Sequence, residues 1–296
     1  MTPPSFATLR LELRPDSVAV LNFDQPGSKA NVLTDQVWED FENAVDILLA
    51  NRTEVTGLVL ASAKPGIFIA GADLKLLGNA PGPNDPAVRS FIDRGNRTLF
   101  KLEALPFPTC AAVDGAALGG GCEVALACDS RICGKNAKFG LPEVSLGLIP
   151  GWGGTQRLPR FISTAMPIET AFSILSAGRT LTIQESAAAG FINAAVDSST
   201  LVDVASQSVT DTRLKSLFES SRRRKREPIP RDQYANFHPS IADSSDAVRA
   251  VASVMTRGAQ LPLREAIALE TEAFMNLAGG EESKRLIAAF FAARKK

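Results

Sequence analysis

Short apolar runs that alternate with helical patterns constrain the fold of this chain more than any other feature. Residues 56–62 (TGLVLAS) form a continuous apolar run, typical of a strand buried on both faces, and residues 109–113 have the same character. Before the first of these runs, apolar residues of the segment 34–51 recur at helical spacing, and Thr34 is a suitable N-cap for that helix. The alternation predicts an α/β fold with a sheet that is at least partly parallel.

The two ends of the chain differ in pattern. Residues 8–13 and 17–23 alternate between apolar and polar positions and predict a pair of strands. After about residue 159 helical patterns dominate, with one short strand over 191–196 that follows a capping box of Thr182 and Glu185. We therefore expect an α/β core over residues 1–198 and a helical C-terminal region over 199–296. Within that region the sequence predicts a polar, basic linker and three helices, over residues 220–239, 247–255, 263–277 and 281–293.

Charge and length limit the classes of function. The 32 basic and 32 acidic side chains cancel, so the chain has no overall charge that would attract nucleic acid or an anionic membrane. The basic run 222–226 (RRRKR) is a local exception, for which a solvated stretch of linker is the ordinary interpretation and phosphate or RNA binding the alternative. No aromatic residues are interleaved with it, as a surface that stacks bases requires.

Histidine and cysteine usage narrows the chemistry further. His238 is the single histidine and lies in a loop-like stretch, and no GxSxG motif occurs, so nucleophilic triads lack support. No GxGxxG or GxxxxGK[ST] motif occurs either. The four cysteines share one apolar segment without CxxC spacing, which predicts buried free thiols rather than a zinc site or disulfides. With no signal-peptide pattern and no long apolar run, we expect a cytoplasmic protein without a membrane span.

Three segments carry residue types suited to chemistry. In residues 113–129 (VDGAALGGGCEVALACD) a buried strand leads through three glycines into a helix with Glu123 in its first turn. Glycines allow close approach to the main chain, and a helix start offers unpaired N–H groups that favour a developing negative charge. The alternative is a tight turn with a capping acid. In residues 68–77 (FIAGADLKLL), small residues end a strand; the segment is either another exposed N–H donor or a turn capped by Asp73.

The third segment is residues 139–160 (FGLPEVSLGLIPGWGGTQRLPR). Glu143 lies among apolar neighbours, so its pKa is expected to be raised or its charge to be paired. Structural pairing with Arg157 or Arg160 is the alternative to a catalytic role. Trp152, between glycines, is either a core aromatic residue or the wall of a pocket, and we favour the wall.

Together these three segments resemble the enoyl-CoA hydratase family, also called the crotonase superfamily. AGAD, GAxLGGGCE and GxPEVxLGxIPGxGGTQRLPR occur in the order and approximate spacing of that family. SAKPGIFIAGADLKLLGN and ESKRLIAAFFA resemble most the hydratase half of multifunctional fatty-acid oxidation proteins. The chain lacks the length and the GxGxxG motif for their dehydrogenase part, so we expect another polypeptide to perform that step.

The resemblance implies an acid–base role for two glutamates. Glu123 and Glu143 match the two acids that hold a water molecule, with Glu143 as main proton donor to Cα and Glu123 as the group that orients and deprotonates the water. The N–H groups of Ala72 and Gly120 match the oxyanion hole that binds the thioester oxygen. Any Cβ at Gly120 is expected to crowd the thioester.

The resemblance also implies a substrate channel. Lys29 and Ala30 align with the adenine-side loop of coenzyme A, whereas Ala70, Asp73 and Leu74 should line the pantetheine channel. Trp152 is expected to narrow the acyl pocket. No metal or tightly bound cofactor is implied, because coenzyme A is part of the substrate. The implied fold is a spiral of ββα units whose helical C-terminal region serves oligomerisation, as a trimer or dimer of trimers, and as a lid.

The function that this resemblance implies is hydration of a trans-2-enoyl-CoA in fatty-acid β-oxidation. The nearest alternative is a Δ3,Δ2-enoyl-CoA isomerase, or another acyl-CoA reaction of this superfamily. Isomerases often lack the equivalent of Glu123, so the presence of both acids favours hydration. A protein that binds RNA or a partner without catalysis is the alternative from another class, and it should tolerate loss of both acids.

Overall fold

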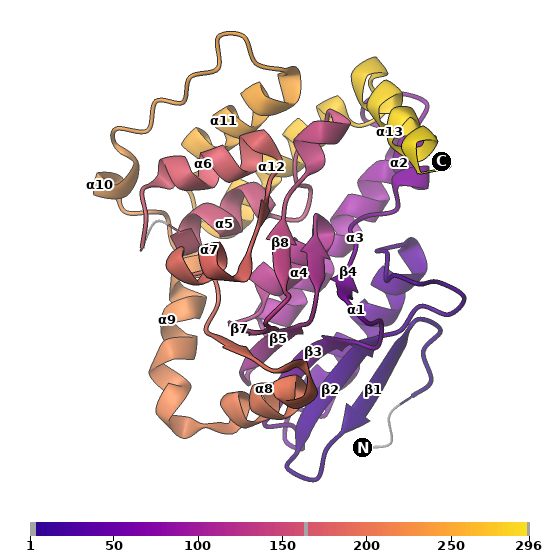
Figure 1. Cartoon of the computed structure of the whole chain (residues 1–296), viewed down its shortest axis with the longest axis vertical. Coiled ribbons are helices and arrows are strands. Elements are labelled where there is room, and N and C mark those ends of the chain that lie inside the picture. The colour runs from indigo at the N-terminus through magenta and orange to yellow at the C-terminus, as the bar shows by residue number, and fades with distance from the viewer. Residues whose placement is uncertain (1–3, 163–164, 295–296) are drawn as a thin grey trace.

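Six strands form the larger of two sheets in a computed structural model that describes residues 4–162 and 165–294 (Figure 1). Along the sheet their order is β1-β2-β3-β5-β7-β10. The first pair is antiparallel, as the alternating pattern predicted, and all other neighbours are parallel. The strands are β1 (Leu9–Leu13), β2 (Val18–Phe23), β3 (Gly57–Ser62), β5 (Thr109–Val113), β7 (Ser130–Gly134) and β10 (Ala194–Val196).

A second sheet of four short strands has the order β4-β6-β8-β9. Its first three strands are parallel, and β9 is antiparallel to β8. These strands are β4 (Ile67–Ile69), β6 (Ala116–Leu118), β8 (Lys138–Gly140) and β9 (Thr180–Leu181).

The chain moves between the two sheets in a repeated way. Strands β3, β5 and β7 belong to the large sheet, and each is followed directly by a strand of the small sheet, namely β4, β6 and β8. Helical segments close each turn: α2 (Leu74–Gly78) and α3 (Pro86–Glu103), then α4 (Gly120–Ala127), then η1 (Glu143–Leu146) and α5 (Gly154–Ile162). This spiral of ββα units confirms the expected α/β class.

Burial on both faces explains why the strands of the large sheet are continuously apolar. One face of β3 and β5 packs against α8 (Leu201–Thr210), which runs beneath the sheet in Figure 1. A Cβ on Gly57 would lie 2.5 Å from Val209 Cγ2, so the helix approaches this strand closely. The other face meets the main core, where α1 (Asp35–Ala50) places Trp38 and Phe41. Thr34 caps α1 by accepting a hydrogen bond from Val37 N–H at 3.3 Å, as predicted.

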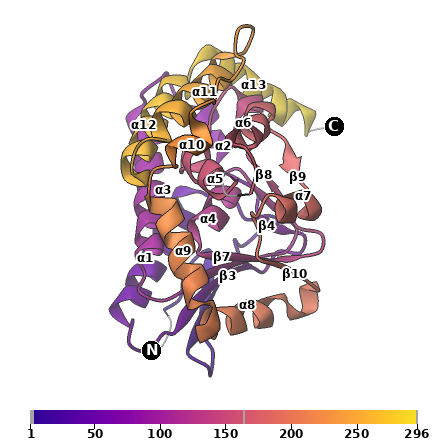
Figure 2. The same ribbon diagram turned by 90° about the vertical axis from the view of Figure 1, so that its left-hand side faces the viewer.

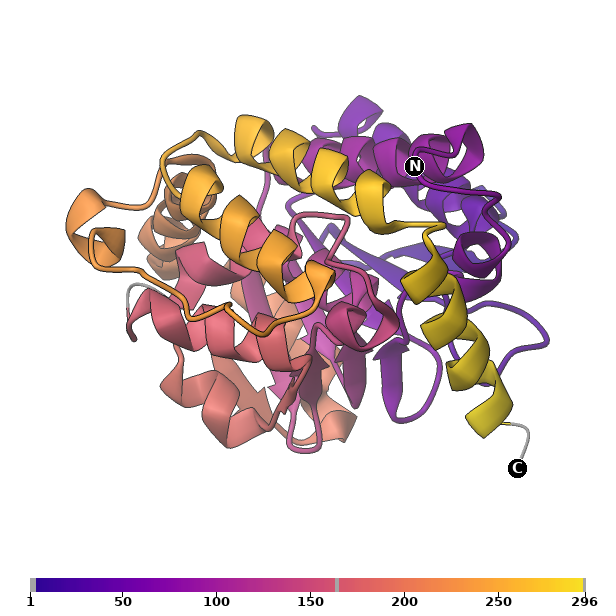
Figure 3. The ribbon, with the colours of Figure 1, turned by 90° about the horizontal axis from the view of Figure 1, so that it is seen from above.

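Helices dominate the C-terminal part, as expected. Thr182 and Glu185 form the predicted capping box at the start of α7. Helices α11 and α12 pack against each other and against α5, and α13 lies against α2 and η1 (Figure 3). No helix in residues 4–162 and 165–294 is long and apolar enough to cross a membrane. The helices are α6 (Ile168–Ala177), α7 (Ile183–Ala188), α9 (Lys215–Arg226), α10 (Arg231–Tyr234), α11 (Asp246–Gly258), α12 (Leu263–Leu277) and α13 (Glu281–Ala293), with short turns η2 (Ser198–Thr200) and η3 (Thr212–Leu214).

The basic run corrects one prediction. Residues 222–226 lie in helix α9, which packs against α5, rather than in a linker (Figure 2). Arg222 donates to both oxygens of the buried carboxylate of Asp129, at 3.0 and 2.7 Å. Lys225 is 1% exposed and donates to the carbonyl oxygens of Ala127 and Cys128 at the end of α4. The linker interpretation failed because charge was taken as a sign of solvation, whereas two of these cations compensate a buried acid.

Candidate active site

A pocket of about 270 Å³ opens where three parallel strands of the small sheet end. Residues that follow β4, β6 and β8 directly reach it, because the carboxyl ends of parallel strands lie along one edge of a sheet. These residues are Ala70, Gly71, Ala72, Gly119, Gly120, Pro142 and Glu143. Helices α12 and α13 close another side with Phe274, Phe290, Phe291 and Arg294.

Two main-chain N–H groups at the pocket take no part in the backbone hydrogen bonds of the neighbouring bridge and helix. The bridge between Leu33 and Ala72 uses the N–H groups of Leu33 and Asp73, so the N–H of Ala72 stays outside it. Gly120 is the first residue of α4, where N–H groups have no partner within the helix. The two segments touch, since a Cβ built on Gly119 would lie 3.7 Å from Gly71 Cα. Ala72 and Gly120 both line the same pocket.

Glycine is required at the turn into α4 for steric reasons. Gly119 has φ +52° and ψ −123°, a backbone conformation that other residues rarely adopt. A Cβ on Gly120 would lie 2.6 Å from both Leu33 Cδ1 and Trp152 Cζ3. A larger residue at position 120 would therefore clash with the protein's own side chains, because Leu33 and Trp152 fill the space where its Cβ would lie.

Glu123 is held by main-chain donors. It lies in the first turn of α4, is 1% exposed, and lines the pocket. Its Oε1 accepts hydrogen bonds from the N–H groups of Trp152 at 2.8 Å and Gly154 at 2.7 Å. Gly153 between them has φ +92°, so the two N–H groups converge on one oxygen in the manner of an anion-binding nest.

Glu143 has different surroundings. It begins η1 after Pro142 and lines the same pocket, and its Oε2 is buried without a hydrogen-bond partner among the described residues. The suggested pairing with Arg157 or Arg160 is wrong. Arg157 forms a buried ion pair with Glu103 at 2.9 and 3.1 Å, and Arg160 donates to main-chain carbonyl oxygens such as Leu261 O at 2.8 Å. The free oxygen of Glu143 is thus available to a ligand.

Burial raises the pKa of both acids. Burial, the nearby charge of Glu270 and that of Glu143 raise the pKa of Glu123 well above its usual value, against the two N–H bonds. Burial raises the pKa of Glu143 to about 8, with a further contribution from the charge of Glu270. Both carboxyl groups therefore hold a proton more strongly than a solvated glutamate does, as proton-transfer groups near neutral pH require.

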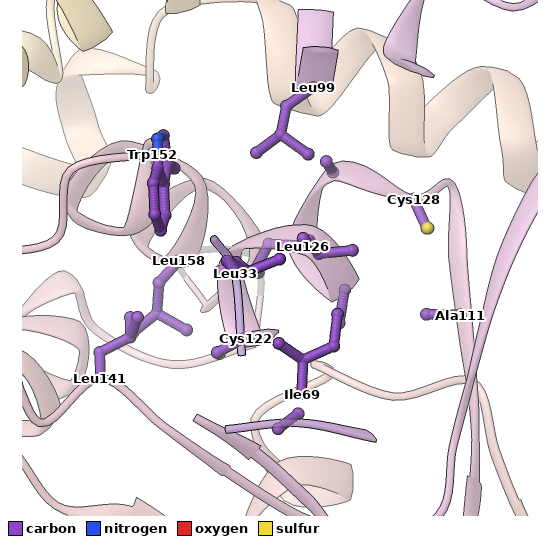
Figure 4. Close-up of a cluster of buried hydrophobic side chains, with 14 of the residues drawn as sticks. Leu33, Ile69, Leu99, Ala111, Cys122, Leu126, Cys128, Leu141, Trp152 and Leu158 are labelled. Atoms are coloured by element: carbon purple, nitrogen blue, oxygen red, sulfur yellow. The ribbon is translucent and has the colours of Figure 1, made fainter. Parts of the chain in front are cut away.

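Trp152 is both a core residue and a wall of the pocket. Its side chain is 2% exposed and packs edge-on against Trp38 and Phe91, with centroids 4.9 and 5.2 Å apart. Its Nε1 donates to Ile92 O at 3.2 Å. Figure 4 shows it in the buried cluster with Leu33 and with the apolar side chains of α4. The indole is thus locked in place while one part of it faces the pocket.

The other expected substrate contacts divide into two groups. Ala70, Asp73 and Leu74 line the pocket, and Asp73 also caps α2 by accepting from Lys75 N–H at 2.9 Å. Lys29 is exposed and Ala30 half-buried in the preceding loop, and neither lines the pocket. Their contact with coenzyme A stays a prediction.

Sequence reasoning missed a further buried acid beside this site. Glu270 of α12 is fully buried and accepts from the N–H groups of Gly153 at 2.5 Å and Thr155 at 2.9 Å. The sequence did contain a signal for Glu270, because this acid lies on the apolar face of a helix between Ile267 and Phe274. Among the described residues no group of three or more His, Cys, Asp or Glu side chains is arranged to hold a metal ion.

Solved structures of similar proteins share this fold. An enoyl-CoA hydratase from Bacillus anthracis is 26% identical, with a TM-score of 0.60 and coverage of 97% of this chain and 96% of that one. DspI from Pseudomonas aeruginosa is 27% identical, with a TM-score of 0.63 and coverage of 75% and 86%. An enoyl-CoA hydratase from Bacillus halodurans has a TM-score of 0.68 at 22% identity, covers 95% and 99%, and supports the fold alone.

The family model for enoyl-CoA hydratase/isomerase matches residues 14–221. That stretch contains every strand of the two sheets except β1, together with the pocket segments 70–73, 119–123 and 142–154. The chain therefore belongs to the enoyl-CoA hydratase/isomerase family.

Proposed function

We propose that this protein is an enoyl-CoA hydratase that adds water across the double bond of a trans-2-enoyl-CoA. The observation that carries the proposal is the meeting of two carboxyl groups, Glu123 and Glu143, in one pocket with the N–H groups of Ala72 and Gly120, which have no partner among the described residues. Hydration needs these parts together: a base for the water, an acid for Cα, and donors for the charge on the thioester oxygen.

The two acids divide the proton transfers. A water molecule held between them adds its oxygen to Cβ and gives a proton to Glu123, whose orientation is fixed by the N–H groups of Trp152 and Gly154. Glu143 delivers its proton to Cα from an oxygen that has no partner among the described residues. The proton gained by Glu123 then returns to Glu143, so the pair starts the next cycle with one proton.

The main chain stabilises the charge that develops. As oxygen adds to Cβ, negative charge moves to the thioester oxygen, and the N–H groups of Ala72 and Gly120 are placed to donate to it. Such donors bind the transition state more strongly than the ground state, and loss of one typically costs about 10²–10³-fold in rate. Because both donors belong to the backbone, their positions depend on strands and turns rather than on side-chain rotamers.

Isomerisation is the second candidate, since the family description covers both reactions. A Δ3,Δ2-isomerase moves one proton along the acyl chain and needs one carboxyl group and no water. The free Oε2 of Glu143 would suffice for that task. The elaborate hold on Glu123 has no use in such a reaction, and we therefore place isomerisation second. A role in fatty-acid breakdown, a cytoplasmic location and a trimeric assembly remain predictions.

The test is turnover of crotonyl-CoA, followed by loss of the ultraviolet absorbance of the conjugated enoyl thioester. We expect rapid loss with the wild type and a decrease of about 10²–10⁴-fold in kcat for Glu123→Gln and for Glu143→Gln. Glu219→Gln, a change of an exposed acid in α9, is the matched control and should keep full activity.

Each other outcome has a definite meaning. If crotonyl-CoA and longer 2-enoyl-CoA esters are all inert while a 3-enoyl-CoA gains conjugated absorbance, the protein is an isomerase. Full activity in Glu123→Gln would remove the base from this mechanism and contradict the proposal.

A further inference from the structure

Four successive N–H groups between Trp152 and Thr155 are shared in alternation by two carboxylates. The N–H groups of residues 152 and 154 point to Glu123 Oε1, as described above. Those of residues 153 and 155 point to Glu270, at 2.5 Å to Oε1 and 2.9 Å to Oε2. The hydroxyl of Thr155 adds a third donor to Glu270 Oε2 at 2.5 Å. One turn therefore ties an acid of the α/β core to an acid of the helical C-terminal region.

Gly153 makes this alternation possible. Its φ of +92° turns neighbouring N–H groups to opposite sides of the turn. A Cβ there would lie 1.9 Å from Arg157 Nη1, so no larger residue fits. Arg157 in turn donates to Trp152 O at 2.6 Å, which fixes the turn from its carbonyl side. The position of Glu123 thus depends on the hydrogen bonds that Glu270 accepts from the opposite side of the turn 152–155.

Among the residues that the structure describes, none is a cation paired directly with Glu270, as a purely structural buried acid normally requires. The guanidinium of Arg157 is near but is paired with Glu103, and the hydrogen bonds of Glu270 come from Gly153 and Thr155. Burial raises the pKa of Glu270 to about 7, against the hydrogen bonds from Thr155 and Gly153 and the charge of Arg157. A buried carboxylate without its own cation is costly for stability, so its presence calls for another role.

We propose that Glu270 is a positioning residue, which holds the turn 152–155 so that Glu123 faces the pocket and which places a negative charge behind Glu123. This inference rests on the proposed function, because a positioning role has meaning only if Glu123 takes part in the reaction. It assigns a part of the active site to helix α12, well outside the glycine-rich segments.

The ionisable groups that bear on Glu270 come from four elements. Glu123 of α4 and Glu143 of η1 are the acids whose pKa its charge raises. Arg157 and Arg160 of α5 are the nearby cations, and Glu103 of α3 neutralises Arg157. With the charge of Glu270 removed, Glu123 and Glu143 should release their protons at lower pH. Both limbs of the pH profile of kcat/KM should then move to lower pH.

The experiment compares the pH profile of kcat/KM for the wild type and Glu270→Gln. The amide of glutamine must turn its NH₂ toward one of the two N–H donors, so one hydrogen bond is lost along with the charge. We expect kcat at neutral pH to fall by about tenfold to a hundredfold, as misplacement of a catalytic group does. KM should change little, and the profile should shift toward lower pH.

Two further variants separate positioning from folding. Thr155→Val keeps the N–H of residue 155 but removes the hydroxyl donor, so Glu270 carries less charge and the profile should shift in the same direction by less. Asp129→Asn also disturbs a buried carboxylate, yet Asp129 is not among the groups that shift the pKa of Glu123 or Glu143. It should lower stability and leave the pH profile in place.

A readout independent of turnover distinguishes failure of this inference from failure of the proposed function. The infrared carboxyl band of Glu123, identified by its absence in Glu123→Gln, can be titrated in the wild type and in Glu270→Gln. A shift of that titration to lower pH supports the inference even if no enoyl-CoA is turned over. An unchanged titration together with an unchanged pH profile would overturn it.

Discussion

The two ends of helix α4 each carry a buried acid, and the two acids are compensated in opposite ways. At the N-terminal end, Glu123 receives main-chain N–H groups and lies near two other carboxyls, which with burial raise its pKa. Just beyond the C-terminal end, Asp129 receives Arg222 at 2.7 Å and Lys225 at 3.4 Å. The charges of these cations, with the N–H of Thr109, lower the pKa of Asp129 in spite of burial.

Under the proposed function, the kind of compensation, rather than burial itself, separates the reactive acid Glu123 from the structural acid Asp129. Both side chains are 1% exposed. Cations hold Asp129 in its ionised form at any ordinary pH, so it stabilises the fold and cannot exchange protons. Dipolar donors orient Glu123 without fixing its charge, so it can gain and lose a proton during a reaction.

The largest expected effect is a loss of stability when the structural acid, Asp129, is neutralised. Asp129→Asn leaves Arg222 and Lys225 without a countercharge, and loss of one partner of a buried ion pair costs about 3–5 kcal/mol. Denaturant unfolding should show this loss, while activity per folded molecule is kept. Glu123→Gln should show the reverse, with activity lost and the free energy of unfolding close to that of the wild type. Equal loss of stability in Asp129→Asn and Glu123→Gln would mean that the acids at the two ends of α4 do not differ in role.

A second effect is expected in the pH dependence of stability, which can be measured in the wild type without a substitution. The pKa of Glu143 rises from 4.5 to about 8 on folding, so between these values the folded state keeps a proton that the unfolded chain has released. Its contribution to the free energy of unfolding therefore falls as pH rises through that window. The pKa of Asp129 is lowered from 3.8, so its contribution is present above pH 3.8 and is lost as pH falls below it.

Urea unfolding near pH 4.5 and near pH 8 checks the first window. Glu143→Gln should gain stability relative to the wild type as pH rises between the two values. A constant difference would show that Glu143 titrates normally, and the comparison between the two acids would then rest on geometry alone.

The smallest effect separates the main chain of residue 152 from its side chain. Trp152→Phe keeps the N–H that donates to Glu123 and loses the Nε1 bond to Ile92 O. We expect hydration to persist and kcat/KM to rise for longer acyl chains, by about 0.8 kcal/mol or roughly fourfold for each additional buried CH₂. Rates over a series of chain lengths measure this. An unchanged chain-length profile would show that the indole is no wall of the acyl pocket.

Local patterns predicted most of the elements. Helices α12 and α13 and strand β5 have the bounds that their apolar spacing indicated. Strand β5 is buried throughout, and α12 buries one face along its length. Helix α9 was missed, because its buried positions are Phe218, Ser221 and Lys225, of which only one is apolar. A lysine that faces the core is recognisable only when its acceptor is known.

The candidate site was predictable where its parts lie close together in sequence. Glu123 follows its glycines directly, and Glu143 follows a proline within an apolar segment. Glu270 lies 117 residues from Gly153, which it holds. That contact depends on the packing of α12 against α5, which no local pattern encodes. The close contacts that a Cβ on Gly120 would make with Leu33 and Trp152 were not predictable for the same reason, since these side chains come from other turns of the spiral.

The neighbouring strands β4, β6 and β8 determine more than where the pocket opens. Ala72 follows the first strand, Gly120 the second and Glu143 the third. Adjacent strands lie about 4.8 Å apart, so the pairing of these strands brings the three segments that follow them to neighbouring positions along one edge of the sheet. In the proposed reaction, the thioester oxygen would lie above the first two strands, and the Cα that is protonated would lie near the third. Recognition of the thioester oxygen would thus be a property of backbone geometry, which single side-chain substitutions can scarcely alter.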